Sequence, residues 1–215
     1  WGPDPACTQA WQDLMARYAT HVKSGLLEVS SRETTSPLIQ LISDLLEARD
    51  RHLVNHGNRV SFYATLVANK LQLPLAEQQN LSLGALAHDL DLIGGESSPV
   101  LQLDGSRSDH RPDLGARIGR AMGLPAEAVQ VIALHHERWD GTGYPFGLKE
   151  ERIPLLARIV SLAQTFDDLT ADKPGGIAIP IQIALEKIEQ QSGTAFDPTL
   201  VRIFCRTMRE QPPQQ

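Results

Sequence analysis

Histidines are the residues of this chain whose type and spacing offer the clearest chemistry. Imidazole nitrogens bind borderline and harder divalent cations, and a metal centre needs several of them brought together. The chain has seven histidines, and we set His21 aside as a surface residue. The remaining six fall where helices or helix ends are expected: His52, His56, His88, His110, His135 and His136.

His52 and His56 are four residues apart, so on a helix they share one face and can approach one ion. Taken alone, this pair is better explained as two polar residues of an amphipathic helix, because spacing by itself is weak evidence. His88-Asp89 follows an apolar stretch, and Asp89 is equally suited to cap a helix end. His135-His136 ends another apolar stretch, where buried histidines with satisfied hydrogen bonds are the simpler alternative.

Three such pairs in one small domain favour a metal centre over three separate structural explanations. Histidines and a carboxylate on different helices suit iron, zinc or manganese, and an Asp can bridge two ions. We therefore expect His56, His88, Asp89, His135 and His136 to converge on one pocket.

The elements that must position these residues are helices, so the predicted fold class is all-α, with no sheet beyond a short hairpin. An amphipathic stretch is expected over Pro5–Leu27, and a long helical tract begins with Ser36 as N-cap and Pro37 at the first helical position and runs toward Gln72. A further helix starts at Leu73-Pro74 and stops at Gly94-Gly95. Five more helices are each expected to carry proline at the first position: Pro112–Met122, Pro125–Arg138, Pro154–Thr170, Pro180–Gln191 and Pro198–Arg209. Loops are expected over Gly95–Asp109 and Trp139–Ile153.

Length and composition predict one main helical domain. With 215 residues and 41% hydrophobic content, the chain can bury one sizeable core. We place the domain at residues 36–211, with a helical lead segment at 1–35 and a frayed tail at 212–215. Because the chain begins at Trp1 without a signal peptide, we expect a piece of a longer protein with an input domain ahead of it.

The net charge of −6 argues against nucleic acid or an acidic membrane as a partner, because both are polyanions. A phosphate ligand would need local cations or metal. No apolar run approaches the roughly 20 residues of a membrane-spanning helix. Cys7 and Cys205 lack metal-ligand spacing, so we expect a reducing, cytoplasmic setting.

The sequence around the last histidine pair resembles that of the HD-GYP family, a branch of the HD superfamily of metal-dependent phosphohydrolases. The resemblance is carried by His135-His136-Glu137-Arg138-Trp139-Asp140-Gly141-Thr142-Gly143-Tyr144-Pro145, then Gly147-Leu148, then Ile153-Pro154-Leu155 with Ala157-Arg158-Ile159. Upstream, His88-Asp89 matches the HD dyad, and His56 with Arg59-Val60 matches an earlier motif. The resemblance covers about residues 36–208.

The resemblance implies an HD-type helical bundle that hydrolyses cyclic di-GMP with two or three divalent ions, iron or manganese. It implies that Asp89 is the catalytic residue that bridges the ions, with His56 and His88 on one ion and His135 and His136 on the other. It also implies contacts of the Gly-Tyr-Pro loop with diguanylate cyclase domains.

Four positions depart from the family pattern, and all are positions where the family binds metal or phosphate. Leu92 stands where the family has a lysine near the phosphate, and Gln164 stands where it has a metal-binding Asp. Arg111 stands where the family has a metal-binding histidine, and His110 lies one residue before that position. Of the two cations that the family uses to hold ligand phosphates after the last helix motif, this chain keeps one, Lys173. In members with three ions, a Glu stands at position 52, so His52 either substitutes for it or is solvated.

These departures predict a cyclic di-GMP signalling domain with weakened or lost hydrolysis. His110, Gln164 and His52 are candidate additional metal ligands, and Lys173, Arg111 and Tyr144 are candidate substrate-binding residues. One alternative is an inactive sensor or docking module for signalling domains. The other is a phosphohydrolase that acts on a different nucleotide.

Overall fold

The helical periodicity of the sequence becomes a bundle of packed α-helices in the computed structural model, which describes residues 32–94, 100–101, 107–108, 111–172 and 177–210. The helices in chain order are α2 (Arg32–Arg49), α3 (Arg51–Lys70), α4 (Leu75–Leu86), α5 (Pro112–Ala121), α6 (Ala126–Leu134), α7 (Leu155–Thr170), α8 (Ile181–Gln190) and α9 (Pro198–Glu210). Two 3-10 turns, η1 (Leu90–Gly94) and η2 (Glu150–Arg152), join them. The predicted all-α class is confirmed, and within the described ranges the sheet is limited to the antiparallel pair β1 (Val100–Leu101) and β2 (Arg107–Ser108).

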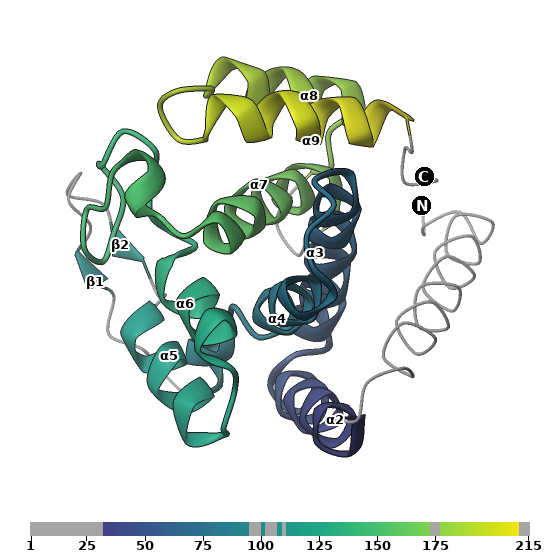
Figure 1. Ribbon diagram of the computed structural model, residues 1–215, viewed down its shortest axis with the longest axis vertical. Coiled ribbons are helices and arrows are strands. Elements are labelled where there is room, and N and C mark those ends of the chain that lie inside the picture. The colour runs from purple at the N-terminus through teal and green to yellow at the C-terminus, as the bar shows by residue number, and fades with distance from the viewer. Residues whose placement is uncertain (1–31, 95–99, 102–106, 109–110, 173–176, 211–215) are drawn as a thin grey trace.

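Helix α3 packs against α4 and α7 and also contacts α2 and α9. Figure 1 shows α8 and α9 lying together across one end of the molecule above α7, with α2 at the opposite end. Helices α5 and α6 pack against each other beside α4. This arrangement brings the first part of α3, the end of α4, the end of α6 and the last turn of α7 close together. None of the described helices is long and apolar enough to cross a membrane.

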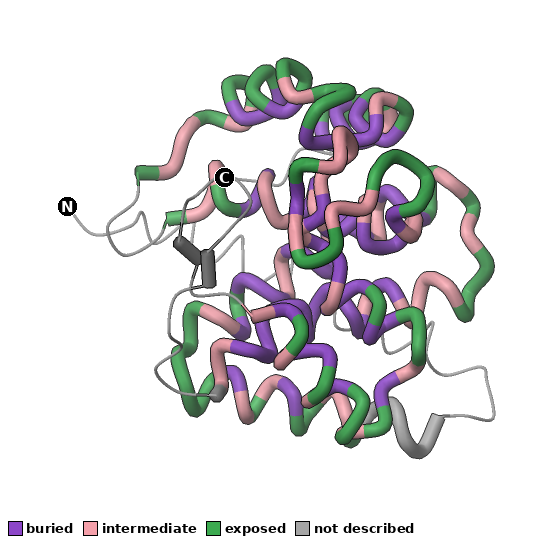
Figure 2. The backbone as a smooth tube through the Cα atoms, turned by 90° about the vertical axis from the view of Figure 1, so that its left-hand side faces the viewer, coloured by how far each residue is buried: buried purple, intermediate pink, exposed green. Residues whose placement is uncertain are grey.

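Two large buried clusters hold the bundle together, and a small third one contains Leu134, Ile153 and Ala157. The larger one joins α3, α4, α7, α8 and α9 around the aromatic rings of Tyr63, Phe166 and Phe204. The smaller one joins α2, α4, α5 and α6 around Leu46 and Ile132. Figure 2 shows the buried positions on the inward faces of the helices, with exposed residues on the outside. Burial of apolar side chains, worth roughly 25 cal/mol per Å² removed from water, therefore fixes how the helices are placed.

The predicted tract from Ser36 toward Gln72 is wrong in two respects. The first helix starts earlier, at Arg32, and carries Pro37 inside it, where the missing amide N–H removes a single hydrogen bond close to the helix start. The tract is also divided at Asp50, which has extended backbone angles and accepts a hydrogen bond from the His52 amide N–H. Asp is among the strongest N-cap residues, and it starts α3 as a separate helix.

Two other helices end earlier than predicted. Helix α4 stops at Leu86, and His88 and Asp89 lie in the turn before η1 rather than on a continuous helix toward Gly94. Helix α6 stops at Leu134 instead of Arg138, because His135 at its C-cap directs Nδ1 to the helical carbonyl of Ile132. A side chain that donates to the last carbonyls satisfies acceptors that would otherwise require another helical turn.

The prediction that five prolines occupy the first helical position holds at the starts of α5 and α9, with Pro112 and Pro198. At α6, α7 and α8 it is wrong, because Pro125, Pro154 and Pro180 stand one residue earlier, as N-caps with extended backbone. A ring-fixed φ suits either position. The predicted stretch 5–27 and most of the predicted loop 95–109 lie outside the described residues.

Candidate metal centre

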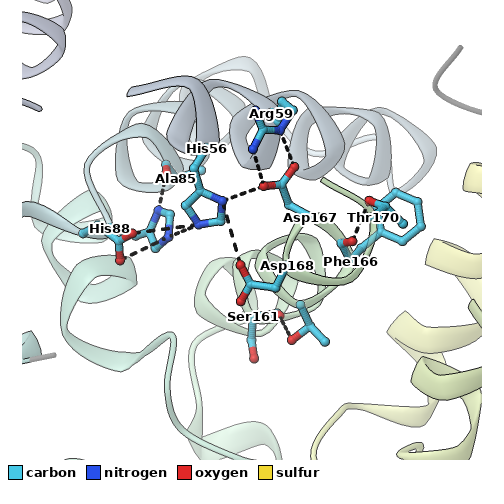
Figure 3. Close-up of polar contacts among 11 residues, drawn as sticks. His56, Arg59, Ala85, His88, Ser161, Phe166, Asp167, Asp168 and Thr170 are labelled. Carbon is cyan, nitrogen blue, oxygen red and sulfur yellow. Dashed lines mark hydrogen bonds and ion pairs between the residues drawn. The ribbon is translucent and has the colours of Figure 1, made fainter. Parts of the chain in front are cut away.

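The site begins on α3, where His56 is buried between α4 and α7. Gly57, the next residue, allows α3 to approach α4 closely, because a Cβ there would come within 2.7 Å of the Leu86 carbonyl oxygen. The His56 ring directs Nδ1 to Asp167 Oδ2 on α7, at 2.6 Å. Its Nε2 points the other way and lies 3.2 Å from Nε2 of His88. Figure 3 shows the imidazole between these two partners.

His88 and Asp89 reach the site from the turn that follows α4. His88 is fully buried, and its Nδ1 lies 2.7 Å from the carbonyl oxygen of Ala85, to which it donates. Asp89 is 5% exposed and brings Oδ1 to 3.4 Å from His88 Nε2 and Oδ2 to 3.9 Å from His56 Nε2. The three side chains offer ligand atoms that all lie within 4.8 Å of one another.

His135 and His136 join the same cluster from the end of α6. The His135 ring lies edge to face with His88 at 5.1 Å between centroids, and the His136 ring lies 4.0 Å from His135. The Nδ1 atom of His135 faces the carbonyl oxygens of Val131 and Ile132. A histidine that donates from Nδ1 carries its lone pair on Nε2, the arrangement found in metal ligands. The structure thus brings together the five side chains expected to converge.

The two facing nitrogens have an electrostatic consequence. His88 donates a hydrogen bond through Nδ1 to Ala85, and His56 donates one through Nδ1 to Asp167. Both Nε2 atoms would then present lone pairs to each other across 3.2 Å. Such a contact is repulsive unless a proton or a cation lies between the two nitrogens. The sequence has therefore placed two acceptors and the Asp89 carboxylate around a point that requires positive charge.

The pKa values of the two histidines move in opposite directions. Burial disfavours the charged form of His56, but the hydrogen bond to Asp167 and the nearby carboxylates outweigh it, so its pKa is raised. For His88, burial dominates over the attraction of Asp89, and its pKa is lowered. His88 is therefore held neutral, with a lone pair on Nε2, which is the form that binds metal.

A divalent cation fits this donor set. Two nitrogens bound to one ion at about 2.1 Å lie about 3.0–3.4 Å apart for angles between 90° and tetrahedral, and the observed separation of 3.2 Å falls in that interval. Asp89 adds an anionic oxygen donor on the same side. Two imidazoles and a carboxylate suit zinc, iron or manganese.

The loop that follows α6 is built onto the site. Gly143 passes so close to the chain that a Cβ on it would lie 2.3 Å from the Arg138 amide nitrogen and 2.6 Å from the His136 carbonyl oxygen. The buried Glu137 carboxylate accepts hydrogen bonds from the amides of Phe146 and Leu148, which fixes the far side of the loop. Burial outweighs these bonds and raises the pKa of Glu137. Tyr144 is thereby stacked against His136.

Of the remaining predicted site residues, three lie within the described part of the chain and two lie outside it. His52 is exposed in the first turn of α3, and Gln164 is half-buried on α7, one turn before Asp168. Arg111 precedes α5, where its amide donates to Asp91 and its guanidinium lies 3.8 Å from Asp113. His110 and Lys173, predicted as a ligand and a phosphate-binding residue, fall outside the described residues. The roles of these residues stay predictions.

The sequence analysis missed one residue of the site, Asp167. The sequence does carry a signal for it. Leu162, Ala163 and Phe166 mark the buried face of α7, and Asp167 continues that face. A charged residue at a core position needs a partner, and Arg59 is such a cation.

Comparisons with known proteins found a matching family and several relatives. Residues 40–200 match the sequence model of the HD domain family. The chain is 36% identical over 188 residues to the cyclic di-GMP phosphodiesterase response regulator RpfG of Xanthomonas campestris, covering 84% of this chain and 49% of that protein. It is 28% identical over 181 residues to a cyclic di-GMP phosphodiesterase of Thermotoga maritima, covering 80% and 49%. It is also 30% identical over 172 residues to a 3'3'-cGAMP-specific phosphodiesterase of Vibrio cholerae, covering 75% and 36%.

Solved structures share the fold. The crystal structure of a cyclic GMP-AMP specific phosphodiesterase from Vibrio cholerae superposes with a TM-score of 0.62 at 23% identity, covering 83% of this chain and 49% of that one. An HD-GYP protein from Bdellovibrio bacteriovorus superposes with a TM-score of 0.61 at 17% identity, covering 94% and 81%. At these identities the likeness concerns the fold alone. The chain spans between 36% and 49% of the length of the three curated relatives above.

Proposed function

Because the chain belongs to the HD domain family, we propose that it is an HD-GYP-type signalling domain that binds cyclic di-GMP or a related cyclic dinucleotide at a divalent metal site, with weakened hydrolysis. The observation that carries the proposal is the pair of facing histidine nitrogens, 3.2 Å apart beside Asp89. The names of the relatives supply the substrate class. We assign the domain to residues 36–211.

In this proposal His56, His88 and Asp89 hold one ion, and His135 and His136 face a second position from the end of α6. A bound divalent ion supplies positive charge to the phosphodiester and lowers the pKa of water to near 7. The Asp89 carboxylate, whose oxygens lie 3.4 and 3.9 Å from the His88 and His56 imidazoles, would be a ligand of this ion and, by the resemblance, the residue shared with the second. Tyr144, stacked beside His136, is the candidate contact for a nucleotide.

Three residues support the weakening of hydrolysis. Leu92, half-buried in η1, supplies no cation beside the phosphate. Gln164 on α7 gives a neutral amide in place of a carboxylate, which is a poorer ligand for a hard cation. Arg111 replaces the histidine that the family pattern has as a ligand, so an imidazole donor is lost at that position. A cytoplasmic setting is part of the same proposal.

The proposal is tested by metal analysis of protein purified without chelator, together with a cyclic di-GMP hydrolysis assay. His88→Ala should abolish metal binding and any turnover, whereas the exposed His52→Ala should leave both within about twofold. Wild-type protein that binds neither Mn²⁺ nor Fe²⁺ would contradict the proposed site. Cyclic 3'3'-GMP-AMP is the second substrate to assay, because one relative is named for it.

A second candidate function is binding without hydrolysis, as a sensor or docking module for diguanylate cyclase or other signalling domains. It is supported by the same Leu92 and Gln164, and by Phe146, which is 71% exposed in the loop that carries Tyr144. An aromatic ring presented to solvent next to an ordered loop suits a protein contact. Tight binding of cyclic di-GMP with no linear product would favour this function over the first.

A further inference from the structure

We infer that Asp167 is a positioning residue, held by Arg59, that fixes the tautomer and orientation of His56 so that Nε2 faces His88 and Asp89. The inference rests on the proposed metal site. It assigns a role to a buried ion pair that stands behind that site.

The geometry of the Asp167 carboxylate carries the inference. Its side chain is fully buried, and its Oδ2 lies 2.6 Å from His56 Nδ1. Arg59, one turn after His56 on α3, donates Nε to Oδ1 at 2.6 Å and a terminal nitrogen to Oδ2 at 2.8 Å. This bidentate pair cannot rotate without losing two charge-assisted hydrogen bonds. Figure 3 shows the guanidinium, the carboxylate and the imidazole in sequence.

A carboxylate at Nδ1 has a direct effect on the imidazole ring. It accepts a hydrogen bond from the Nδ1–H group, so the proton stays on Nδ1 and the Nε2 lone pair is directed at the proposed ion. It also holds the ring in one rotamer, because turning the ring over would point a C–H group at Oδ2. A ligand that is already oriented loses less freedom on binding, and partners behind metal ligands are worth about 10-fold to 100-fold in affinity.

The same acidic group could instead be taken for a metal ligand, since His56, Asp167 and Asp168 also bring ligand atoms within 4.8 Å. That assignment conflicts with the contacts. Both oxygens of Asp167 receive hydrogen bonds from Arg59, and a cation there would lie against a guanidinium. A protonated Nδ1 donates and cannot ligate. Asp167 is therefore behind His56 rather than on the ion.

Asp168 provides a matched control. Its carboxylate lies 4.0 Å from the same Nδ1 atom, beyond hydrogen-bond distance, and its side chain is 40% exposed. Asp167→Asn and Asp168→Asn each remove one negative charge near His56. Only the first replaces the acceptor that His56 and Arg59 share, so a difference between the variants reports positioning rather than charge.

The experiment measures Mn²⁺ affinity by calorimetry for wild type and both variants. We expect Asp167→Asn to weaken binding about 10-fold or more, and Asp168→Asn to change it by less than about threefold. Equal losses in the two variants would overturn the inference in favour of a general charge effect, as would unchanged affinity in Asp167→Asn.

A second measurement needs no variant at Asp167. In metal-free wild-type protein, nitrogen NMR at a pH where the His56 ring is neutral should show the proton on Nδ1, with the signal assigned by its loss in His56→Ala. A proton on Nε2 would overturn the inference. This measurement remains decisive if the wild type takes up no Mn²⁺, a result that would remove the proposed metal site but leave the tautomer to be read.

Discussion

The ring of Tyr144 lies parallel to the ring of His136, with centroids 4.8 Å apart and planes 12° from parallel. The contact joins the glycine-rich loop to the metal-facing end of α6. Offset stacking of this kind contributes about 0.5–1.5 kcal/mol beyond burial. The loop therefore forms one wall of the site, and its shape affects how the histidine is held.

Replacing Gly143 with alanine should disrupt this wall. The new Cβ would overlap the backbone of residues 136–138, which cannot move aside as a flexible side chain would. We expect Gly143→Ala to lower the free energy of unfolding by about 3 kcal/mol, measured by urea denaturation. Gly123→Ala is the control, because its φ is +78° but nothing lies within 4 Å, and it should cost only about 1 kcal/mol. Equal losses would contradict the overlap argument.

Metal content should be one ion per chain rather than two. His56, His88 and Asp89 offer two imidazoles and a carboxylate to one ion, whereas Gln164 and Arg111 stand where the family pattern has a carboxylate and an imidazole for the second. Elemental analysis of protein loaded with excess Mn²⁺ and then desalted measures the ratio. Two tightly held ions at neutral pH would show that His110 and Gln164 serve as ligands after all.

Restoring a single ligand should not restore hydrolysis. We expect Gln164→Asp alone to leave cyclic di-GMP turnover unchanged, because the opposing position still lacks its donor and the phosphate still lacks its cation. Groups that act as a unit have non-additive effects. The measurement is the rate of linear product formation with added Mn²⁺ or Fe²⁺.

The combined variant Gln164→Asp, Arg111→His, Leu92→Lys should raise that rate steeply. If it folds, loads two ions and still leaves the substrate intact, the loss lies in substrate recognition, and Lys173 is the first residue to change. Wild-type turnover that the combined variant cannot exceed would show that these three positions are not defects.

Stability should fall in alkaline solution because of Cys205. Burial raises the pKa of this thiol from 9.0 to about 12, so the folded protein keeps the proton that the unfolded chain loses first. A raised folded pKa means that the stabilising contribution is complete below pH 9 and is lost as the pH rises toward 12. We expect a decrease of up to about 1.4 kcal/mol per pH unit in that window.

Urea denaturation at several pH values between 8 and 11 measures this slope. Cys205→Ala should reduce it, although the smaller side chain also lowers stability at every pH. Only the slope is diagnostic. An unchanged slope in the variant would assign the alkaline loss to another group, and the buried phenol of Tyr63 would be the next to replace.

The sequence was sufficient to predict the helical class and the convergence of five side chains, because apolar periodicity and histidine spacing are local signals. It misplaced the ends of α4 and α6, because a histidine after an apolar stretch can either continue the helix or bond to its last carbonyls. His88 bonds to the Ala85 carbonyl and His135 to those of Val131 and Ile132, and no sequence rule distinguishes them from histidines that continue a helix. Asp167 escaped notice for a different reason, since its partners His56 and Arg59 lie more than 100 residues away.

That separation also bears on biosynthesis. The donors His56, His88 and Asp89 emerge from the ribosome long before residues 155–170, so a nascent chain contains them without the α7 carboxylate that orients the first. Contacts of such long range form late, because closing the intervening loop has an entropic cost. An incomplete chain without α7 should therefore bind metal weakly, and tight binding should begin only after α7 packs against α3.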